Sequence, residues 1–285
     1  MDRPSVDDYF GDWKQREALV QEMIPVIGRL FSQRNVGLFI YGRPLHNRSV
    51  TFIMKSHRFV RQVERNEMSE FESHPMLMEL AKLDLWNAQI DLGKLTVAYM
   101  QHLDSAGDSP VSVADFVRAE LGYLDGVNEK PVEKSQDVVL YGFGRIGRLM
   151  ARLLIERTSH GEVMRLKAIV VRPGGEGDLD KRANLFTNDS VHGTFQGTLR
   201  VDHERNMLIA NGNEIKVIYA SSPEEINYND YGIDEALIID NTGMFRDEAG
   251  LSRHLAAQGA AKVILTAPGK GDIKNIVYGI NDDQI

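Results

Sequence analysis

The chain has 285 residues, more than a single domain usually contains, and this length predicts two domains. Hydrophobic residues make up 42% of it and charged residues 26%, a balance typical of a globular protein. The net charge of −8 argues against nucleic acid or an anionic membrane as a partner. No apolar run approaches the roughly 18 residues that span a bilayer, and the polar, acidic N-terminus is unlike a targeting peptide. We therefore expect a soluble, cytoplasmic protein.

The sequence contains no cysteine. Disulfides, thiolate metal sites and a cysteine nucleophile are therefore excluded within these residues. The histidines His46, His57 and His74 are scattered and have no pair of carboxylates at ligand spacing nearby. No metal site is predicted from them.

Residues 1–133 are predicted to form a mostly α-helical N-terminal domain. Pro25 lies inside a first apolar stripe and is expected to kink or break the helix there. The stripe has three- and four-residue spacing and comprises Val20, Met23, Ile24, Ile27, Leu30 and Phe31.

Three further helices are predicted in the same domain. One carries a stripe around residues 50–57, and another includes Leu77, Leu80, Ala81 and the pair 84–85. Ser112 is expected to cap a last helix that runs to about Leu124. The short apolar run at residues 36–41 fits a strand or a helix equally well, because periodicity does not decide between them.

A change of pattern divides the chain. Residues 125–134 are polar, contain Gly and Pro, and read as a linker. From residue 134 to 285, short β-branched runs alternate with helical stripes, which predicts an α/β domain with a Rossmann-type parallel sheet. The predicted strands are residues 137–141, 166–171, 236–240 and 262–266, with an antiparallel excursion over 201–218 that turns at Asn211-Gly212.

A glycine-rich segment follows the first of these strands. Gly142-Phe143-Gly144-Arg145-Ile146-Gly147 fits G-x-G-x-x-G, and an amphipathic helix follows it. In a dinucleotide site the first glycine permits a tight turn, the second lets the pyrophosphate approach the backbone, and the third allows close packing of helix on strand. The helix N-terminus favours the anionic pyrophosphate. A glycine-rich turn without a ligand is the alternative, and the agreement of strand, spacing and helix disfavours it.

The residue after the second predicted strand bears on the choice of cofactor. NAD-preferring sites usually carry Asp or Glu there to hold the ribose 2′-hydroxyl, whereas this chain has Arg172. An arginine pairs with a 2′-phosphate, which favours NADP slightly. Alternatively, Arg172 is a solvated loop residue, and Glu176 or Asp178 holds the ribose.

A basic stripe lies in the N-terminal domain. Lys55, Arg58, Arg61 and Arg65 recur at helical spacing and could dock an acidic partner or a phosphate-bearing ligand. A solvated or domain-facing helix side is the favoured interpretation, since charged faces usually are solvated.

Several segments of the second domain resemble the glyceraldehyde-3-phosphate dehydrogenase family. Residues 141–148, YGFGRIGR, resemble its opening NGFGRIGR, and residues 188–195, NDSVHGTF, resemble YDSxHGxF. Residues 240–245, DNTGMF, look like ESTGxF, and residues 261–268, AKVILTAP, look like AKxVIISAP. Residues 277–281, VYGIN, are similar to the VxGVN that follows. The first 133 residues lie outside the resemblance, so the chain resembles an N-terminally extended member.

This resemblance implies NAD or NADP as cofactor. The loop residues Gly142 to Gly147, with Arg145 and Ile146, would contact the pyrophosphate. Thr242 and Gly243 would lie along the cofactor, and Thr266 would lie near the nicotinamide. Arg172 stands where the family usually has an aspartate.

The family's reaction is the oxidative phosphorylation of glyceraldehyde 3-phosphate in glycolysis and gluconeogenesis. A cysteine thiolate attacks the aldehyde, a hydride passes to the nicotinamide, and inorganic phosphate cleaves the thioester with a histidine as base. The family's cysteine lies in SCTTN after the VN segment, and the sequence stops at Ile285, before that point. We therefore assign no catalytic residue and expect an incomplete dehydrogenase. His192 is interpreted as a structural loop histidine, and a homotetramer is implied by resemblance.

Two alternatives to this function stay open. Erythrose-4-phosphate dehydrogenase is a sister activity that the cofactor domain does not distinguish. A non-catalytic NAD(P)-binding regulatory protein is the second alternative, and the apolar surface of an unfinished sheet would argue against it.

Overall fold

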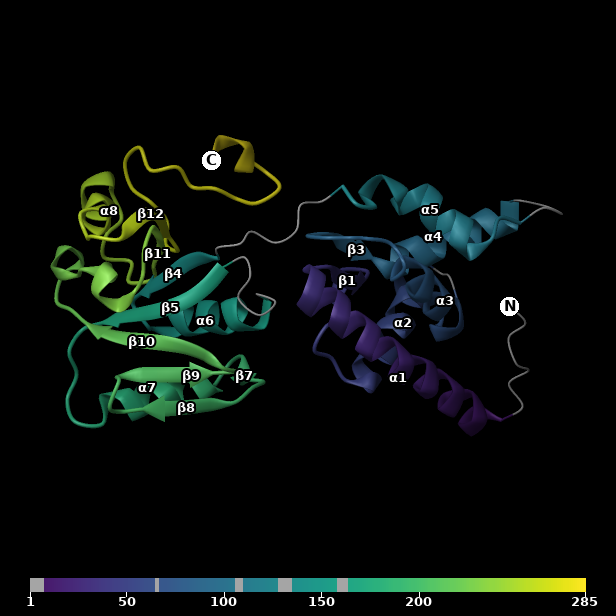
Figure 1. Cartoon of the computed structure of the whole chain (residues 1–285), viewed down its shortest axis with the longest axis horizontal. Helices are drawn as coiled ribbons and strands as arrows, with labels where there is room; N and C mark the ends of the chain where they lie inside the picture. The colour runs from purple at the N-terminus through teal and green to yellow at the C-terminus, as the bar shows by residue number, and fades with distance from the viewer. Residues whose placement is uncertain (1–7, 65–66, 106–109, 128–134, 158–163) are drawn as a thin grey trace. The chain divides into compact units, whose positions relative to one another are not determined.

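The computed structural model describes residues 8–64, 67–105, 110–127, 135–157 and 164–285 (Figure 1). The chain divides into two compact units, Met1–Val132 and Glu133–Ile285. Residues 128–134 of the predicted linker, and Arg65 of the basic stripe, lie outside the described residues. Within the described part, no helix is both long and apolar enough to cross a membrane.

Helices make up most of the first unit. They are α1 (Tyr9–Arg34), α2 (Val50–Glu64), α3 (Glu70–Leu80), α4 (Leu92–Ser105), α5 (Val113–Leu121) and the 3₁₀ turn η1 (Gly122–Leu124). Their apolar sides pack into one core cluster, in which Val20, Met23, Leu38, Ile53 and Leu77 are fully buried. Ser112 caps α5 as predicted, because its side chain accepts a hydrogen bond from the backbone N–H of Asp115.

The ambiguous run at residues 36–41 forms a strand, β1 (Gly37–Ile40). It pairs antiparallel with β2 (Arg43–Pro44) and parallel with β3 (Gln89–Asp91) in a sheet of order β2-β1-β3. The parallel partner lies about fifty residues away in the chain, so the decision between strand and helix comes from a long-range contact. Neither β3 nor α4 was anticipated from the sequence.

The structure differs from two local expectations in this unit. Of the kink or break expected at Pro25, the break is absent, because α1 runs from Tyr9 to Arg34 through the proline. The proline is exposed while Met23, Val26 and Ile27 beside it are buried, so packing of the opposite side holds the helix together. The third helix ends at Leu80 and excludes residues 84–85. The N–H groups of Lys82 and Leu83 bond to carbonyls three residues back, and that of Asp84 donates to the side chain of Asp125 at 2.6 Å.

The second unit contains a seven-stranded sheet of order β12-β11-β4-β5-β10-β9-β8. Strands β12 to β10 in this order run parallel, and β9 and β8 continue antiparallel. The four predicted strands are confirmed as β4, β5, β11 and β12. The elements are β4 (Gln136–Tyr141), α6 (Arg145–Arg157), β5 (Met164–Val171), α7 (Asp178–Thr187), β6 (Asn188–Asp189), β7 (Gly193–Thr194), β8 (Leu199–Asp202), β9 (Met207–Ala210), β10 (Asn213–Tyr219), η3 (Pro223–Glu225), η4 (Tyr228–Tyr231), β11 (Ala236–Asp240), α8 (Glu248–Leu255), β12 (Ala260–Leu265) and η5 (Asp282–Gln284).

The predicted excursion over residues 201–218 is confirmed as the strands β8, β9 and β10. Asn211 and Gly212 join β9 to β10 with φ angles of 46° and 81°, as a two-residue hairpin turn requires. Strand β10 also pairs parallel with β5, which connects the excursion to the main sheet.

Alternate residues of β4 face two different cores. Val138 and Leu140 pack with α6 and α7, and Val139 and Tyr141 pack on the other face with Tyr228 of η4. Burial on both sides explains why β4 reads as a continuous apolar run. It also fixes the carboxyl end of β4 rigidly, and the glycine-rich loop follows at that point.

Candidate functional site

The candidate site lies at the carboxyl ends of β4 and β11. From β4 the chain continues through β5 to β10 on one side, and β11 and β12 then pair on the other side of β4. The place where β4 and β11 end, called the crevice from here on, is therefore a topological switch point, the position at which open α/β sheets bind ligands. The loop after β4 carries Gly142–Gly147, and the loop after β11 carries Thr242 and Gly243.

The first and third glycines of the loop are required by packing. Gly142 has a φ of +95°, and a Cβ there would lie 2.8 Å from Cγ2 of Thr242. A Cβ on Gly147 would overlap the carbonyl oxygen of Gly142. Turn and helix thus approach each other as closely as the sequence pattern predicts.

The second glycine faces open space. A Cβ on Gly144 would meet no atom within 4 Å, and the residue is exposed. Helix α6 begins at the next residue, so its first backbone N–H groups have no partner within the helix and point out of its N-terminus. Together with the helix dipole, these groups form a cradle for an anion. The residues present therefore fit a pyrophosphate.

The side chains of the loop differ in their surroundings. Phe143 is buried and stacks on Phe186 with ring centroids 6.0 Å apart, so only its backbone faces the crevice. Arg145 and Ile146 are exposed, Ile146 to 51%. Phe143 consequently anchors the loop to the core, while its two neighbours are accessible to a ligand.

A buried aspartate that the sequence analysis did not single out holds the loop after β11. Asp240 is fully buried, and its Oδ1 accepts hydrogen bonds from the N–H of Thr242 at 2.7 Å and from its hydroxyl at 2.8 Å. Its Oδ2 lies 2.8 Å from Nε2 of the buried His254. Burial, followed by the charge of Asp240, raises the pKa of Tyr141 to about 12. A charged residue at the end of an apolar strand was the available signal for this network.

Thr266 joins the same network from the end of β12. Its hydroxyl donates to the carbonyl oxygen of Asp240 at 3.0 Å and lies 3.1 Å from Oδ1 of Asn241. The structure thus brings together the three predicted segments around Gly142, Thr242 and Thr266.

Arg172 follows β5 and is exposed. Its Nη2 lies 2.9 Å from Sδ of Met244, a residue of the loop after β11. Of the two alternative ribose ligands, Asp178 is engaged by Arg182, whose Nε donates to it at 2.6 Å. Glu176 is exposed. Among these candidates, Arg172 is the one whose side chain reaches toward the loops of the crevice.

His192 lies in a separate polar cluster. Its N–H and its Nδ1 contact Oδ1 of Asp189 at 2.8 and 3.0 Å, and the N–H of Val191 donates to the same oxygen at 3.0 Å. Backbone hydrogen bonds from His192 and Val191 hold the pKa of Asp189 well below its usual range. This arrangement stabilises the turn between β6 and β7. Elsewhere in the described residues, no three His, Asp or Glu side chains gather as a metal site.

Comparisons with known proteins agree with this geometry. The family model described as the NAD binding domain of glyceraldehyde 3-phosphate dehydrogenase matches residues 136–248. A glyceraldehyde-3-phosphate dehydrogenase-like protein of Pseudomonas aeruginosa is 51% identical over 265 residues, which are 92% of this chain and 56% of that protein. This match is longer than the second unit, so it includes much of the first unit as well.

Other relatives match shorter stretches of the chain. The glyceraldehyde-3-phosphate dehydrogenase of Thermotoga maritima is 40% identical over 149 residues, 52% of this chain and 41% of that enzyme. The chloroplastic glyceraldehyde-3-phosphate dehydrogenase A of Zea mays is 34% identical over 181 residues, 64% of this chain and 43% of the plant protein. The chain spans about half the length of the relatives it matches. Through its NAD-binding domain the chain belongs to the glyceraldehyde-3-phosphate dehydrogenase family, and its cofactor is NAD or NADP.

Proposed function

We propose that this chain supplies the cofactor-binding part of a phosphorylating aldehyde dehydrogenase that acts on glyceraldehyde 3-phosphate. One observation carries the proposal: Gly142 and Gly147 leave no room for a Cβ, whereas Gly144 opens to solvent at the N-terminus of α6. That combination provides a tight turn with a free anion cradle. The names of the relatives support the substrate, and inorganic phosphate would be the second one.

Each predicted site residue has a role in this proposal. The backbone of residues 142–147 holds the pyrophosphate, Thr242 and Gly243 lie along the cofactor, and Thr266 lies toward the nicotinamide. The nicotinamide supplies a hydride acceptor when bound. Asp240 positions Thr242 and Thr266 through the hydrogen bonds described above.

The covalent steps of the family need a thiolate, and these 285 residues contain no cysteine. We therefore assign cofactor binding, and no catalytic residue, to this chain. The family resemblance also supports assembly of several copies into a homo-oligomer.

Gly144→Ala tests the cofactor site. The added methyl meets no protein atom within 4 Å, so the fold is expected to stay intact while the pyrophosphate is kept from the backbone. Loss of one hydrogen bond to a charged group corresponds to about 1.5 kcal/mol or more, so the affinity for NAD(P) should fall by about tenfold or more. Isothermal titration calorimetry of the full chain with NAD and NADP measures the change.

Gly28→Ala is the matched control, because Gly28 is exposed on α1 and equally without neighbours within 4 Å. Its NAD(P) affinity should equal that of the unmodified chain. Equal affinities for all three proteins, or no binding by any of them, would refute the assignment of the crevice as the cofactor site.

A further inference from the structure

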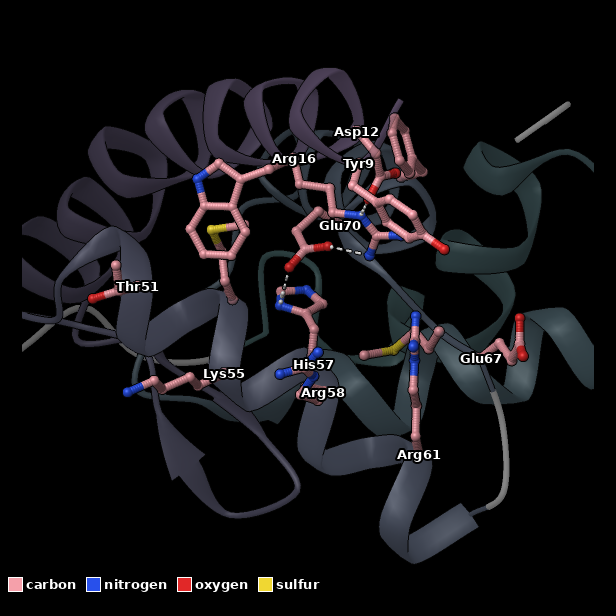
Figure 2. A pocket seen from close by; sticks show the side chains of 14 residues that line it. Tyr9, Asp12, Arg16, Thr51, Lys55, His57, Arg58, Arg61, Glu67 and Glu70 are labelled. Atoms are coloured by element: carbon pink, nitrogen blue, oxygen red, sulfur yellow. Dashed lines mark hydrogen bonds and ion pairs between the residues drawn. The ribbon is translucent and has the colours of Figure 1, made fainter. Parts of the chain in front are cut away.

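The first unit contains a cavity of about 650 Å³ that the cofactor function does not use. It lies among α1, α2 and α3, and its size is within the range of small-molecule sites. Figure 2 shows Lys55, Arg58 and Arg61 on α2, with Lys55 directed away from the two arginines, and Arg16 and Glu70 facing each other. The P. aeruginosa relative shares much of this unit, so the cavity belongs to a part of the chain that recurs beyond the family's cofactor domain.

A buried carboxylate forms part of the cavity wall. Glu70 has a side chain that is only 2% exposed, and its Oε2 accepts a hydrogen bond from Nη1 of Arg16 at 3.1 Å. Arg16 also donates from Nε to Asp12 at 2.8 Å, so one guanidinium is shared between two carboxylates. Its Oε1 lies 3.5 Å from Nδ1 of His57. Because a carboxylate has about four acceptor positions, Glu70 still has capacity for one donor on a ligand.

His57 lies beside this carboxylate and is neutral. Burial lowers its pKa, with the nearby charges of Glu70, Arg16 and Glu72 acting as smaller influences. Its Nδ1 donates to the carbonyl oxygen of Ile53 at 2.9 Å, and the hydroxyl of Ser73 donates to its Nε2 at 2.7 Å. Both ring nitrogens are occupied by the protein, so His57 stiffens the wall and leaves ligand recognition to its neighbours.

Three cations stand over the cavity from α2. Lys55, Arg58 and Arg61 are exposed, and within the described part of the chain none of them forms an ion pair with a carboxylate. Three members of the basic stripe therefore line the same cavity. Guanidinium and ammonium groups that are not paired within the protein are suited to a phosphate or a carboxylate.

Aromatic side chains contribute the opposite side. Tyr9 and Trp13 of α1 and Phe71 of α3 line the cavity, and Tyr9 and Trp13 are 83% and 45% exposed. Exposed aromatic rings bury apolar surface and stack favourably when a planar group covers them. The cavity therefore combines a ring-binding surface, a cationic side and a buried acceptor.

We propose that this cavity binds a small organic anion in which a phosphate or carboxylate is joined to a planar ring, a nucleoside monophosphate being the model compound. The anionic group pairs with Arg58 and Arg61, the ring lies on Trp13, and an N–H of the ring donates to Glu70. The proposal does not depend on the cofactor crevice, which is built from other residues.

Trp13 provides a direct readout, because the chain has two tryptophans and Trp86→Phe leaves only the one in the cavity. The full chain carrying this change is titrated with guanosine monophosphate, and saturable quenching of Trp13 fluorescence is expected. Replacing both Arg58 and Arg61 by Gln should weaken the affinity by about tenfold or more. The matched control replaces Arg29 and Arg118, two exposed arginines away from the cavity, and should keep the affinity unchanged.

Comparator ligands define the chemistry. Guanosine lacks the phosphate and inorganic phosphate lacks the ring. Each should therefore bind at least about tenfold more weakly than guanosine monophosphate. Saturable binding of benzoate that also requires Arg58 and Arg61 would support the site with a carboxylate as its natural anion.

Several results would overturn the proposal. Equal affinity of the arginine double variant and its control is one, and equal binding of guanosine and its monophosphate is another. Loss of quenching in Gly144→Ala would place the nucleotide in the cofactor crevice instead. Quenching by polyglutamate alone would make α2 a docking surface for an acidic protein.

Discussion

Asp240 holds the loop after β11 through both of its carboxylate oxygens. One carboxylate oxygen accepts two hydrogen bonds from Thr242, and the other faces His254. The ring of His254 packs edge-on against Tyr141 and Phe245, with centroid distances of 4.6 and 5.1 Å. A fully buried carboxylate is costly unless it is paired and hydrogen-bonded. The same contacts that make its burial tolerable also fix the loop along which the cofactor is proposed to lie.

Arg172→Asp tests the choice between the two cofactors. The change removes a cation that suits a 2′-phosphate and provides an acceptor for the ribose 2′-hydroxyl, so the ratio of NADP to NAD affinity should fall by about tenfold or more. Titration calorimetry with both cofactors measures this ratio. Arg200→Asp makes the same charge change on the edge strand β8, and the ratio should stay as it was. An unchanged ratio in Arg172→Asp would remove the 2′-phosphate role.

The helices α1 and α6 show how an element combines local and tertiary causes. Helix α6 has its start fixed by the glycine loop and its apolar side fixed by the sheet, so its sequence pattern and its position agree. Helix α1 contains an internal proline and persists because Met23, Val26 and Ile27 are buried on either side of it. Tertiary burial of one face outweighs the local loss of a backbone hydrogen bond.

Pro25→Ala should therefore stabilise the first unit. Alanine restores a helical N–H at an exposed position, which is worth about 3 kcal/mol in helix propensity, offset by about 1 kcal/mol of added freedom in the unfolded chain. We expect an increase of about 2 kcal/mol in the free energy of unfolding. Guanidinium unfolding followed by tryptophan fluorescence measures it, because Trp13 and Trp86 both lie in this unit.

Gly28→Ala on the same helix is the control and should stabilise by about 0.5–1 kcal/mol. A decrease in stability of Pro25→Ala would show instead that the proline ring contributes to packing or to the shape of the helix.

At the scale of the whole molecule, the two units have separate apolar cores. One cluster belongs to the first unit, and the other two lie on the two faces of the large sheet. Segments that share one apolar core unfold together in one cooperative transition. Because the two units have separate cores, we expect each unit to unfold in its own transition. Ligands of the crevice and of the proposed anion cavity would then act on different transitions.

Gly147→Ala tests this separation. The methyl overlaps the carbonyl oxygen of Gly142, so the second unit should lose about 1–3 kcal/mol, the typical cost of overpacking. The tryptophan-reported transition of the first unit should not move, while hydrogen exchange of the second unit accelerates. Gly144→Ala, with open space around it, should change neither. Equal shifts of both transitions would mean that the chain unfolds as one cooperative body.

The sequence alone determined the α/β character of the second unit, the strand–glycine loop–helix unit of β4 and α6, and the turn at Asn211-Gly212. In each case the information is local, because hydrophobic period, glycine spacing and turn residues act over a few neighbours. The resemblance of the motifs then led to the family.

Only the tertiary structure decided the rest. Residues 37–40 form a strand because they pair with β3, and α1 continues through Pro25 because one of its faces is buried. Asp240 contacts a histidine that lies fourteen residues away in the sequence. The cavity proposed to bind an anion likewise joins side chains from three helices, a grouping that the spacing of the basic stripe does not show. The described cations of the stripe are exposed, as a solvated face requires. These features depend on contacts between segments that are distant in the sequence. Such contacts form only when the chain folds, so no local sequence pattern predicts them.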